Sequence, residues 1–245
     1  MSTTTKTLTA KVEPFDSFWE MPGDIEGGYK KFSQFYRHNY LRYFPADKVV
    51  RILVIGCGPG YLVNLLAQEG YTNVLGIDST PDKVQPAQRR GLNCRPDEAF
   101  PFLERATDPF DVIVLESEIN HLTNEEIIQF LTLCWNRLRP SGTLIIHSLN
   151  GANPITGYAS LAQNFDHYNT FTDLSLAQAV RLGGFDDVTI IPLNSYVFFA
   201  NPLNYIAWGM SELYTLVFRL NFLLYGKPTK LFTKKIAAIA RKAGA

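Results

Sequence analysis

Two side chains that could move a proton follow an apolar segment predicted to be a strand at residues 110–116. His121 and Glu118 lie in the stretch "SEINHL", between that strand and a predicted helix. An imidazole or a carboxylate placed there can take the proton of a weakly acidic hydroxyl as the hydroxyl attacks an electrophile. We take His121 as the leading candidate for a general base, with Glu118 either orienting it or serving as the base. A packing role for His121 near the helix start is the alternative.

A glycine-rich turn, "ILVIGCGPGYL" at residues 52–62, follows an apolar strand and leads into a helix. No Lys follows the turn, which excludes a P-loop. A dinucleotide fingerprint needs its third glycine at the position of Tyr61, so that pattern is also absent. Gly56, Gly58 and Gly60 instead form a GxGxG turn that lets a ligand approach the backbone closely. Asp78 ends the next strand, where a carboxylate can accept hydrogen bonds from both ribose hydroxyls.

Strands and helices alternate from residue 49 onward, which predicts a parallel sheet with helices on both faces. Ligands in such sheets bind beyond the carboxyl ends of the strands. Predicted strands cover 49–55, 73–78, 92–95, 110–116 and 143–149. The residues that this rule brings to one edge are Gly56, Gly58, Gly60, Asp78, Asp97, Glu98, Glu116, Glu118, His121 and Asn150.

Composition narrows the classes of function. The chain has 245 residues, with 23 Lys and Arg against 23 Asp and Glu, so its balanced charge gives no electrostatic footprint for nucleic acid. Its three cysteines lack CxxC spacing, which argues against a zinc site and a disulfide scaffold and suits a reducing compartment. The Thr-rich start has no apolar run typical of a secretory signal. We therefore expect a cytoplasmic protein.

The segments "ILVIGCGPGYL", "GIDSTPDKVQPA" and "FDVIVLESEINHLTNEE" together resemble the motifs of class I S-adenosylmethionine (SAM)-dependent methyltransferases over residues 49–191. The resemblance implies a Rossmann-like α/β fold, with a seven-stranded, mostly parallel sheet and helices on both faces. It also implies SAM as cofactor and S-adenosylhomocysteine as product. In that family the glycine loop contacts the methionine portion, and the acidic residue that ends the second strand, here Asp78, binds the ribose. Asp97 or Glu98 would lie near the adenine, and the backbone around Glu116 would flank the sulfonium.

A narrower resemblance covers the segment after the fifth strand. "SLNGANPITGYASLAQNFDHYNTFTDLSLAQAVRLGGF" is similar to bacterial methyltransferases of polysaccharide and lipopolysaccharide biosynthesis. Asn150, Asn153 and Pro154 match that pattern, whereas its Asp-x-Thr-His element is altered, with Asn169 at the position of the histidine. The ending "LFTKKIAAIARK" resembles the final antiparallel strand of such proteins.

Quinone O-methyltransferases with a similar strand end carry a Glu-x-x-Glu-His run associated with a divalent metal. Here Ser117 and Asn120 replace both glutamates, and only His121 remains. We therefore expect no metal. His147, which lies inside the fifth strand, is expected to be a core histidine.

The basic and aromatic segment "YKKFSQFYRHNYLRYF" predicts an N-terminal helix that caps the acceptor pocket. Tyr29, Arg37 and His38 are its candidate acceptor contacts, and Asn150, which follows the fifth strand, is a further candidate. An ordinary surface helix is the alternative for this segment.

Residues 201–226 predict a long amphipathic helix with too many polar residues for a membrane span. We expect it to pack on its own sheet. A homodimer contact, or peripheral attachment to the inner face of a membrane helped by the lysines at 227–235, are the alternatives.

The predicted organisation has five parts: a disordered start (1–14), a helical cap (15–48), a SAM-binding core (49–200), a helical insertion (201–228), and a final strand with its tail (229–245). The predicted function is SAM-dependent O-methylation of a saccharide hydroxyl in surface polysaccharide or lipopolysaccharide synthesis, for instance on an acidic sugar such as Kdo. The alternatives are a small-molecule O- or N-methyltransferase of secondary metabolism and a non-catalytic SAM-binding partner subunit.

Overall fold

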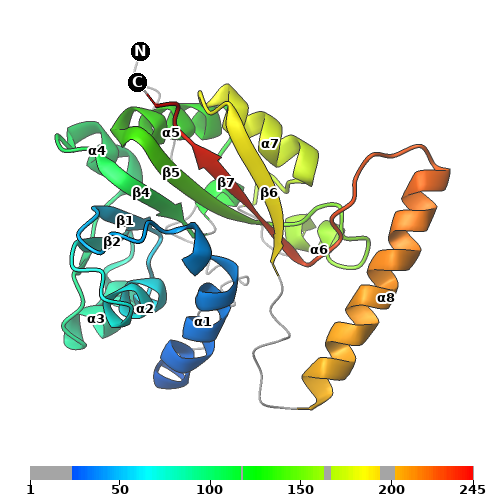
Figure 1. Cartoon of the computed structure of the whole chain (residues 1–245), viewed down its shortest axis with the longest axis horizontal. Coiled ribbons are helices and arrows are strands. Elements are labelled where there is room, and N and C mark those ends of the chain that lie inside the picture. The colour runs from blue at the N-terminus through cyan, green and yellow to red at the C-terminus, as the bar shows by residue number, and fades with distance from the viewer. Residues whose placement is uncertain (1–23, 117, 163–166, 194–201, 245) are drawn as a thin grey trace.

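The computed structural model describes residues 24–244, apart from 117, 163–166 and 194–201. Its centre is a seven-stranded sheet with the order β3-β2-β1-β4-β5-β7-β6 (Figure 1). Strand β7 runs antiparallel to both β5 and β6, and the other pairings are parallel. The strands are β1 (Ile52–Ile55), β2 (Val74–Asp78), β3 (Cys94–Pro96), β4 (Phe110–Leu115), β5 (Leu138–Leu149), β6 (Asp187–Leu193) and β7 (Lys235–Arg241).

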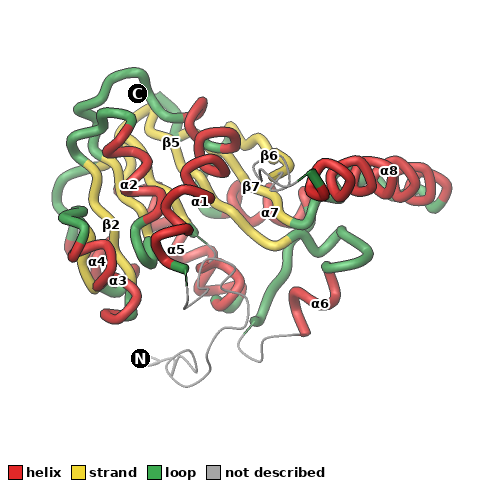
Figure 2. Tube along the Cα trace, turned by 90° about the horizontal axis from the view of Figure 1, so that it is seen from below, coloured by secondary structure: helices red, strands yellow, loops and turns green. Residues whose placement is uncertain are grey.

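Helices cover both faces of the sheet (Figure 2). They are α1 (Ile25–Asn39), α2 (Tyr61–Gln68), α3 (Pro81–Arg89), α4 (Ala99–Arg105), α5 (Asn124–Arg137), α6 (Gly157–Ala162), α7 (Asp173–Leu182) and α8 (Leu203–Leu224), with short 3-10 turns η2 (Leu41–Tyr43) and η3 (Glu118–His121). The predicted seven-stranded, mostly parallel α/β fold is confirmed.

Alternation along the central strands builds two apolar layers. In β1, Ile52 and Val54 face one layer, with α1, α2 and α3, while Leu53 and Ile55 face the other, with α4, α5 and α7. Because both faces are covered, β1 and β4 are apolar along most of their length, as is usual for central parallel strands. This arrangement leaves the carboxyl ends of β1, β2 and β4 as the places where polar side chains can gather.

Strand β5 begins five residues earlier than the sequence pattern predicts. It includes Leu138 to Gly142, because Phe110 pairs with Leu138 before an irregularity shifts the register. Ser141 takes a positive φ of 63° inside this irregular start, and its amide is held by the carbonyl of Lys242. Residues 140–142 (Pro-Ser-Gly) therefore form a bend within β5.

Helix α8 departs from the expectation that it packs on its own sheet. It stands away from the body at the edge of the molecule (Figure 1), and none of its residues is buried. Its contacts with the described body include those of Phe218 and Phe222, whose ring centroids lie 5.9 and 4.7 Å from that of Phe232. Among the described residues no helix is long and apolar enough to cross a membrane.

Candidate functional site

The glycine turn between β1 and α2 has the backbone that its sequence requires. Gly56, Gly58 and Gly60 have φ values of 70°, 48° and 78°, in the left-handed region that favours glycine. A Cβ at Gly60 would also lie 2.9 Å from that of Ala87, whereas a Cβ at Gly58 would meet no atom within 4 Å. Side chains therefore pack against the turn at Gly60, whereas the space beside Gly58 is open and a ligand can lie there against the backbone.

Asp78 holds this turn in place from the end of β2. Its carboxylate accepts hydrogen bonds from the backbone amides of Gly58 (3.0 Å) and Thr80 (2.9 Å), and the side chain is largely buried. Its carbonyl accepts a hydrogen bond from the amide of Asp97 (2.9 Å), which connects the end of β2 to the residue that follows β3. Asp78 therefore lies beside the glycine turn, where the prediction puts the ribose ligand.

The two acidic candidates after β3 differ in their surroundings. Asp97 is mostly buried, and its carboxylate pairs with Arg105 and, at 3.6 Å, with Arg95. Glu98 is exposed and occupies the N-cap position of α4 without a capping hydrogen bond from its side chain. Both remain predictions as adenine neighbours, with Asp97 held in place by its arginines.

Helix α1 contacts the site through two tyrosines. Tyr29 is buried and donates a hydrogen bond from its hydroxyl to the carbonyl of Pro59 in the glycine turn (2.7 Å). Burial raises its pKa to about 12. One helical turn beyond Phe32, Tyr36 donates to Glu116 Oε2 at 2.8 Å. The N-terminal helix therefore touches the glycine turn directly, and Tyr29 supports that turn.

A buried polar cluster lies past the end of β4. Glu116 Oε2 accepts from Tyr36 and lies 3.9 Å from His147 Nδ1. On the other side of the imidazole, Lys235 Nζ lies 3.4 Å from His147 Nε2. Burial raises the pKa of Glu116 to about 7, although Tyr36 and Lys235 oppose that shift. Burial and Lys235 hold the pKa of His147 well below its usual range, so the imidazole is neutral and its contact with Glu116 is not an ion pair.

One carboxylate oxygen of Glu116 is free to accept a further hydrogen bond. Glu116 Oε1 is buried and accepts no hydrogen bond from the described residues. Buried acceptors are normally satisfied, so this oxygen fits a partner supplied by a ligand or by water. His147 is a buried core histidine as predicted, but it lies in a titratable cluster that sequence spacing does not reveal.

His121 ends η3, directly past β4, and its ring lies 4.6 Å from that of His167 in an edge-to-face arrangement. His121 is half-buried and His167 is buried. Glu118 begins η3, but its side chain lies outside the described residues. The structure thus brings a second imidazole to the predicted base, from a segment 46 residues further along the chain.

Two asparagines fix the position of the histidine pair. Asn120 donates to the carbonyl of Asn169 (2.9 Å) and accepts from Ser148 Oγ (3.3 Å). Asn169 in turn donates to the carbonyl of Leu122 (2.6 Å). The altered element after the fifth strand therefore fastens the segment around His167 to the turn that carries His121, which the sequence alone does not show.

Three predicted acceptor contacts are placed elsewhere. Arg37 donates from Nε to Glu69 Oε1 at 3.0 Å on the outer surface of α2, and His38 is exposed in the last turn of α1. Asn150 is fully buried, and its amide nitrogen donates to the carbonyls of Leu231 (2.9 Å) and Thr233 (2.8 Å). The Asn150 oxygen accepts from the amide of Ala152 (3.0 Å). These placements argue against acceptor contacts and give Asn150 the role of fastening the return from α8.

The polar groups at these strand ends fit SAM as a ligand. The open backbone at Gly58, the carboxylate of Asp78 beside it and the unsatisfied oxygen of Glu116 lie along neighbouring strand ends. Among the described residues no group of three or more His, Cys, Asp or Glu side chains could hold a metal ion.

The model of a methyltransferase domain family matches residues 29–190, about two thirds of the chain. This chain belongs to that family. Residues 29–190 therefore form a methyltransferase domain.

Curated relatives include a ubiquinone biosynthesis O-methyltransferase of Caulobacter sp. (strain K31), 31% identical over 107 residues. The match covers 41% of this methyltransferase and 41% of that relative. Relatives from other bacteria carry the same name.

Solved structures share the fold at low sequence identity. A SAM-dependent methyltransferase from Archaeoglobus fulgidus superposes with a TM-score of 0.64 at 20% identity, covering 87% of this chain and 94% of that one. Phosphoethanolamine N-methyltransferase 2 of Haemonchus contortus, in complex with SAM, gives a TM-score of 0.56 at 14% identity and covers 95% of this chain and 61% of that one.

The saccharide acceptor predicted from the sequence, with the assignment to polysaccharide or lipopolysaccharide synthesis, is contradicted by these relatives. Their name refers to quinone biosynthesis and not to a sugar. The segment around Asn150, on which the narrower resemblance rested, has a structural role in this chain, which explains why it was a poor guide to the acceptor.

Proposed function

We propose that this methyltransferase transfers the methyl group of SAM to a phenolic hydroxyl of a small quinol-type acceptor. The observation that carries the proposal is the pairing of His121 with His167 just past the end of β4, next to the strand end that bears the glycine turn. The names of the curated relatives support the acceptor class.

Proton transfer distinguishes a phenol from a sugar as acceptor. A phenolic hydroxyl has a pKa near 10, whereas an aliphatic hydroxyl is far less acidic. Imidazole titrates near pH 6.5, so a histidine base can assist a phenol with a much smaller mismatch in pKa. In this proposal His121 accepts the phenolic proton as the oxygen forms its bond to the methyl carbon, and His167 packs against the ring of His121 and fixes its orientation.

Other residues of the chain would bind and orient the cofactor. The backbone at Gly58 and the carboxylate of Asp78 would hold the cofactor, and Glu116 would offer its buried oxygen to the positively charged end. When bound, SAM supplies a methyl group on a positively charged sulfur, and loss of that methyl leaves neutral S-adenosylhomocysteine. Because the electrophile is already activated, alignment of the acceptor and removal of its proton are what the protein has to provide.

The test is release of S-adenosylhomocysteine by the full chain with a panel of acceptors. The panel contains catechols and trihydroxybenzenes, with and without an apolar side chain, and neutral and acidic sugars as the comparison set. We expect turnover with one or more phenols and none with the sugars. Turnover confined to sugars or amines would overturn the proposal.

A further inference from the structure

The outward face of α8 is a continuous apolar surface. Nine large apolar residues lie on it, each at least 42% exposed. At 100° per residue they fall within about 140° of the helix circumference, and no charged residue lies among them. They are Tyr205, Ile206, Met210, Leu213, Leu216, Val217, Leu220, Leu223 and Leu224, which we call the α8 outer face.

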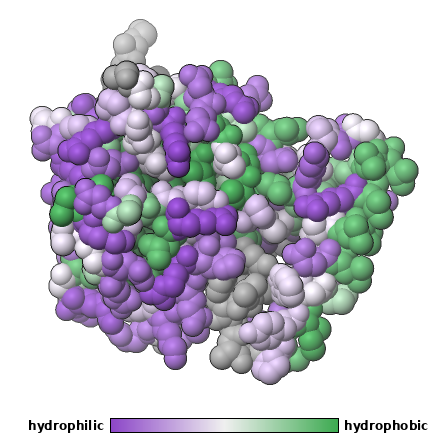
Figure 3. Space-filling model, viewed as in Figure 1, coloured by the Kyte–Doolittle hydropathy of each residue, from purple (hydrophilic) through white to green (hydrophobic). Residues whose placement is uncertain are grey.

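The opposite side of the same helix carries four small or polar residues and two phenylalanines. The half-buried positions recur at helical spacing and face the body of the protein: Asn204, Ala207, Ser211, Thr215, Phe218 and Phe222. A helix that stabilises its own domain places its largest apolar stripe inward. Helix α8 reverses this order, and Figure 3 shows its apolar side chains gathered along the outer edge of the molecule.

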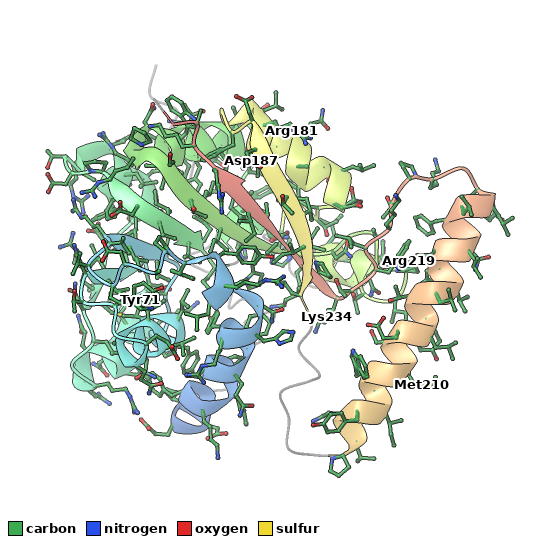
Figure 4. The ribbon with its side chains drawn as sticks, viewed as in Figure 1. Tyr71, Arg181, Asp187, Met210, Arg219 and Lys234 are labelled. Carbon is green, nitrogen blue, oxygen red and sulfur yellow. The ribbon has the colours of Figure 1, made fainter. Side chains whose placement is uncertain are left out.

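Positive charge is concentrated beside this face. Between residues 203 and 235 the chain has five basic residues and one acidic residue, a net charge of +4, although the whole chain is neutral. Lys227, Lys230 and Lys234 are exposed after the helix end. Arg219 Nε donates to the carbonyl of Lys230 at 2.9 Å, which holds this lysine-bearing return against the helix (Figure 4).

We propose that the α8 outer face inserts into the surface of an anionic lipid bilayer, with the lysines at 227–234 on the headgroup phosphates. Large contiguous apolar patches on a protein surface mark a protein or membrane contact. Charge favours lipid, because a second copy would bring the same excess of positive charge to the interface, whereas anionic headgroups neutralise it. The helix would lie in the interface, about 33 Å long at 1.5 Å per residue. Helix α8 lies C-terminal to the residues matched by the family model, so the proposal concerns this chain's own segment and does not depend on the acceptor.

Flotation of the full chain with vesicles tests the proposal. We compare vesicles of phosphatidylcholine alone with vesicles that contain 30% phosphatidylglycerol, where ~30% is chosen to resemble an anionic leaflet. The variant is Leu213→Asp. Its matched control is Leu174→Asp on α7, because both leucines have the same exposed fraction, 52%.

We expect the wild type and Leu174→Asp to float with the anionic vesicles. Leu213→Asp should bind them at least about tenfold more weakly than the wild type does. Replacing Lys227 and Lys230 by Gln should weaken binding to anionic vesicles by about fivefold per charge. Circular dichroism of each variant establishes that it is folded.

Three results would overturn the proposal. The first is absence of wild-type binding to either vesicle. The second is equal loss of binding in Leu174→Asp. The third is a wild-type dimer at micromolar concentration, seen by sedimentation velocity, that Leu213→Asp dissociates, since this would show a second copy as the occupant.

Discussion

Helices α1 and α8 use their apolar side chains in opposite ways. Helix α1 buries Tyr29, Phe35 and Tyr36 in the apolar layer that it shares with α2, and it reaches two parts of the site, the glycine turn and Glu116. Helix α8 is longer, yet it buries no residue and presents nine large apolar side chains to the outside. The comparison indicates that α1 belongs to the core and to the site of the domain. Helix α8 instead leaves its apolar face exposed, which fits the proposed contact with a bilayer surface.

The largest expected effect is on stability in α1. Phe35 is 5% exposed and packs edge-to-face against Tyr36 and Tyr40. Phe35→Ala should lower the free energy of unfolding by about 3–5 kcal/mol, through lost burial and the cavity left behind. Urea denaturation measures this difference. A loss below about 1 kcal/mol would contradict the assignment of α1 to the core, because such a value is typical of a surface site.

The next effect concerns the pH dependence of the buried cluster. Glu116 has a pKa of about 7 in the folded chain against 4.5 ordinarily, so the folded state keeps a proton that the unfolded state loses. Its contribution to stability is therefore full below about pH 4.5 and is lost as the pH rises to about 7, by at most about 3 kcal/mol. Glu116→Gln should flatten the pH profile of unfolding over this range relative to the wild type. The control is Glu125→Gln, an exposed residue in the first turn of α5, which should leave the profile unchanged.

A comparable loss is expected in cofactor affinity when the support of the glycine turn is removed. Asp78→Ala removes the acceptor of the Gly58 and Thr80 amides and the predicted ribose ligand. Hydrogen bonds to charged groups contribute about 1.5–3 kcal/mol, so SAM should bind roughly 10- to 150-fold more weakly. Calorimetric titration measures this affinity. Unchanged affinity would show that Asp78 does not hold the cofactor.

A smaller effect is expected where α1 meets the turn. Tyr29→Phe removes the hydroxyl that donates to the carbonyl of Pro59 and leaves the ring in place under Arg90. The lost hydrogen bond corresponds to about 1 kcal/mol. We expect SAM affinity and stability each to fall by no more than this amount. Loss of all cofactor binding would mean that Tyr29 touches the ligand itself.

The smallest effect is predicted for α8. Leu213→Ala should change the free energy of unfolding by less than about 0.5 kcal/mol, as at other exposed positions. The same urea titration used for Phe35→Ala gives the comparison directly. A loss of 2 kcal/mol, about the cost of truncating a buried leucine, would mean that α8 packs against the domain in solution.

The glycine turn and the position of Asp78 beside it could be predicted because their signals are local in sequence. Three glycines in five residues, an aspartate at the end of the next strand and alternating strands and helices each follow from short-range rules. The capping box that starts α5, Thr123 with Glu126, is a local signal of the same kind. The seven-stranded fold follows from these elements and from the family resemblance.

The acceptor half could not be predicted, because its contacts join distant segments. His121 meets His167, and Glu116 meets Lys235 through His147, across separations that no periodicity encodes. Asn150 matched a motif by type, but its contacts with the 231–233 backbone assign it to packing. The orientation of α8 was predicted wrongly because an apolar stripe shows that a surface is covered and does not show by what.

The central claim is that the glycine turn and Asp78 bind the cofactor while His121 takes the acceptor's proton. Turnover of His121→Ala at saturating SAM and an active phenol, measured together with its affinity for SAM, tests it most directly, with Gln129→Ala on the exposed side of α5 as control. We predict that turnover falls by roughly 100-fold or more, as for loss of a general base, while SAM affinity stays within about twofold. Wild-type turnover in the variant, or loss of SAM binding with turnover, would contradict the assignment.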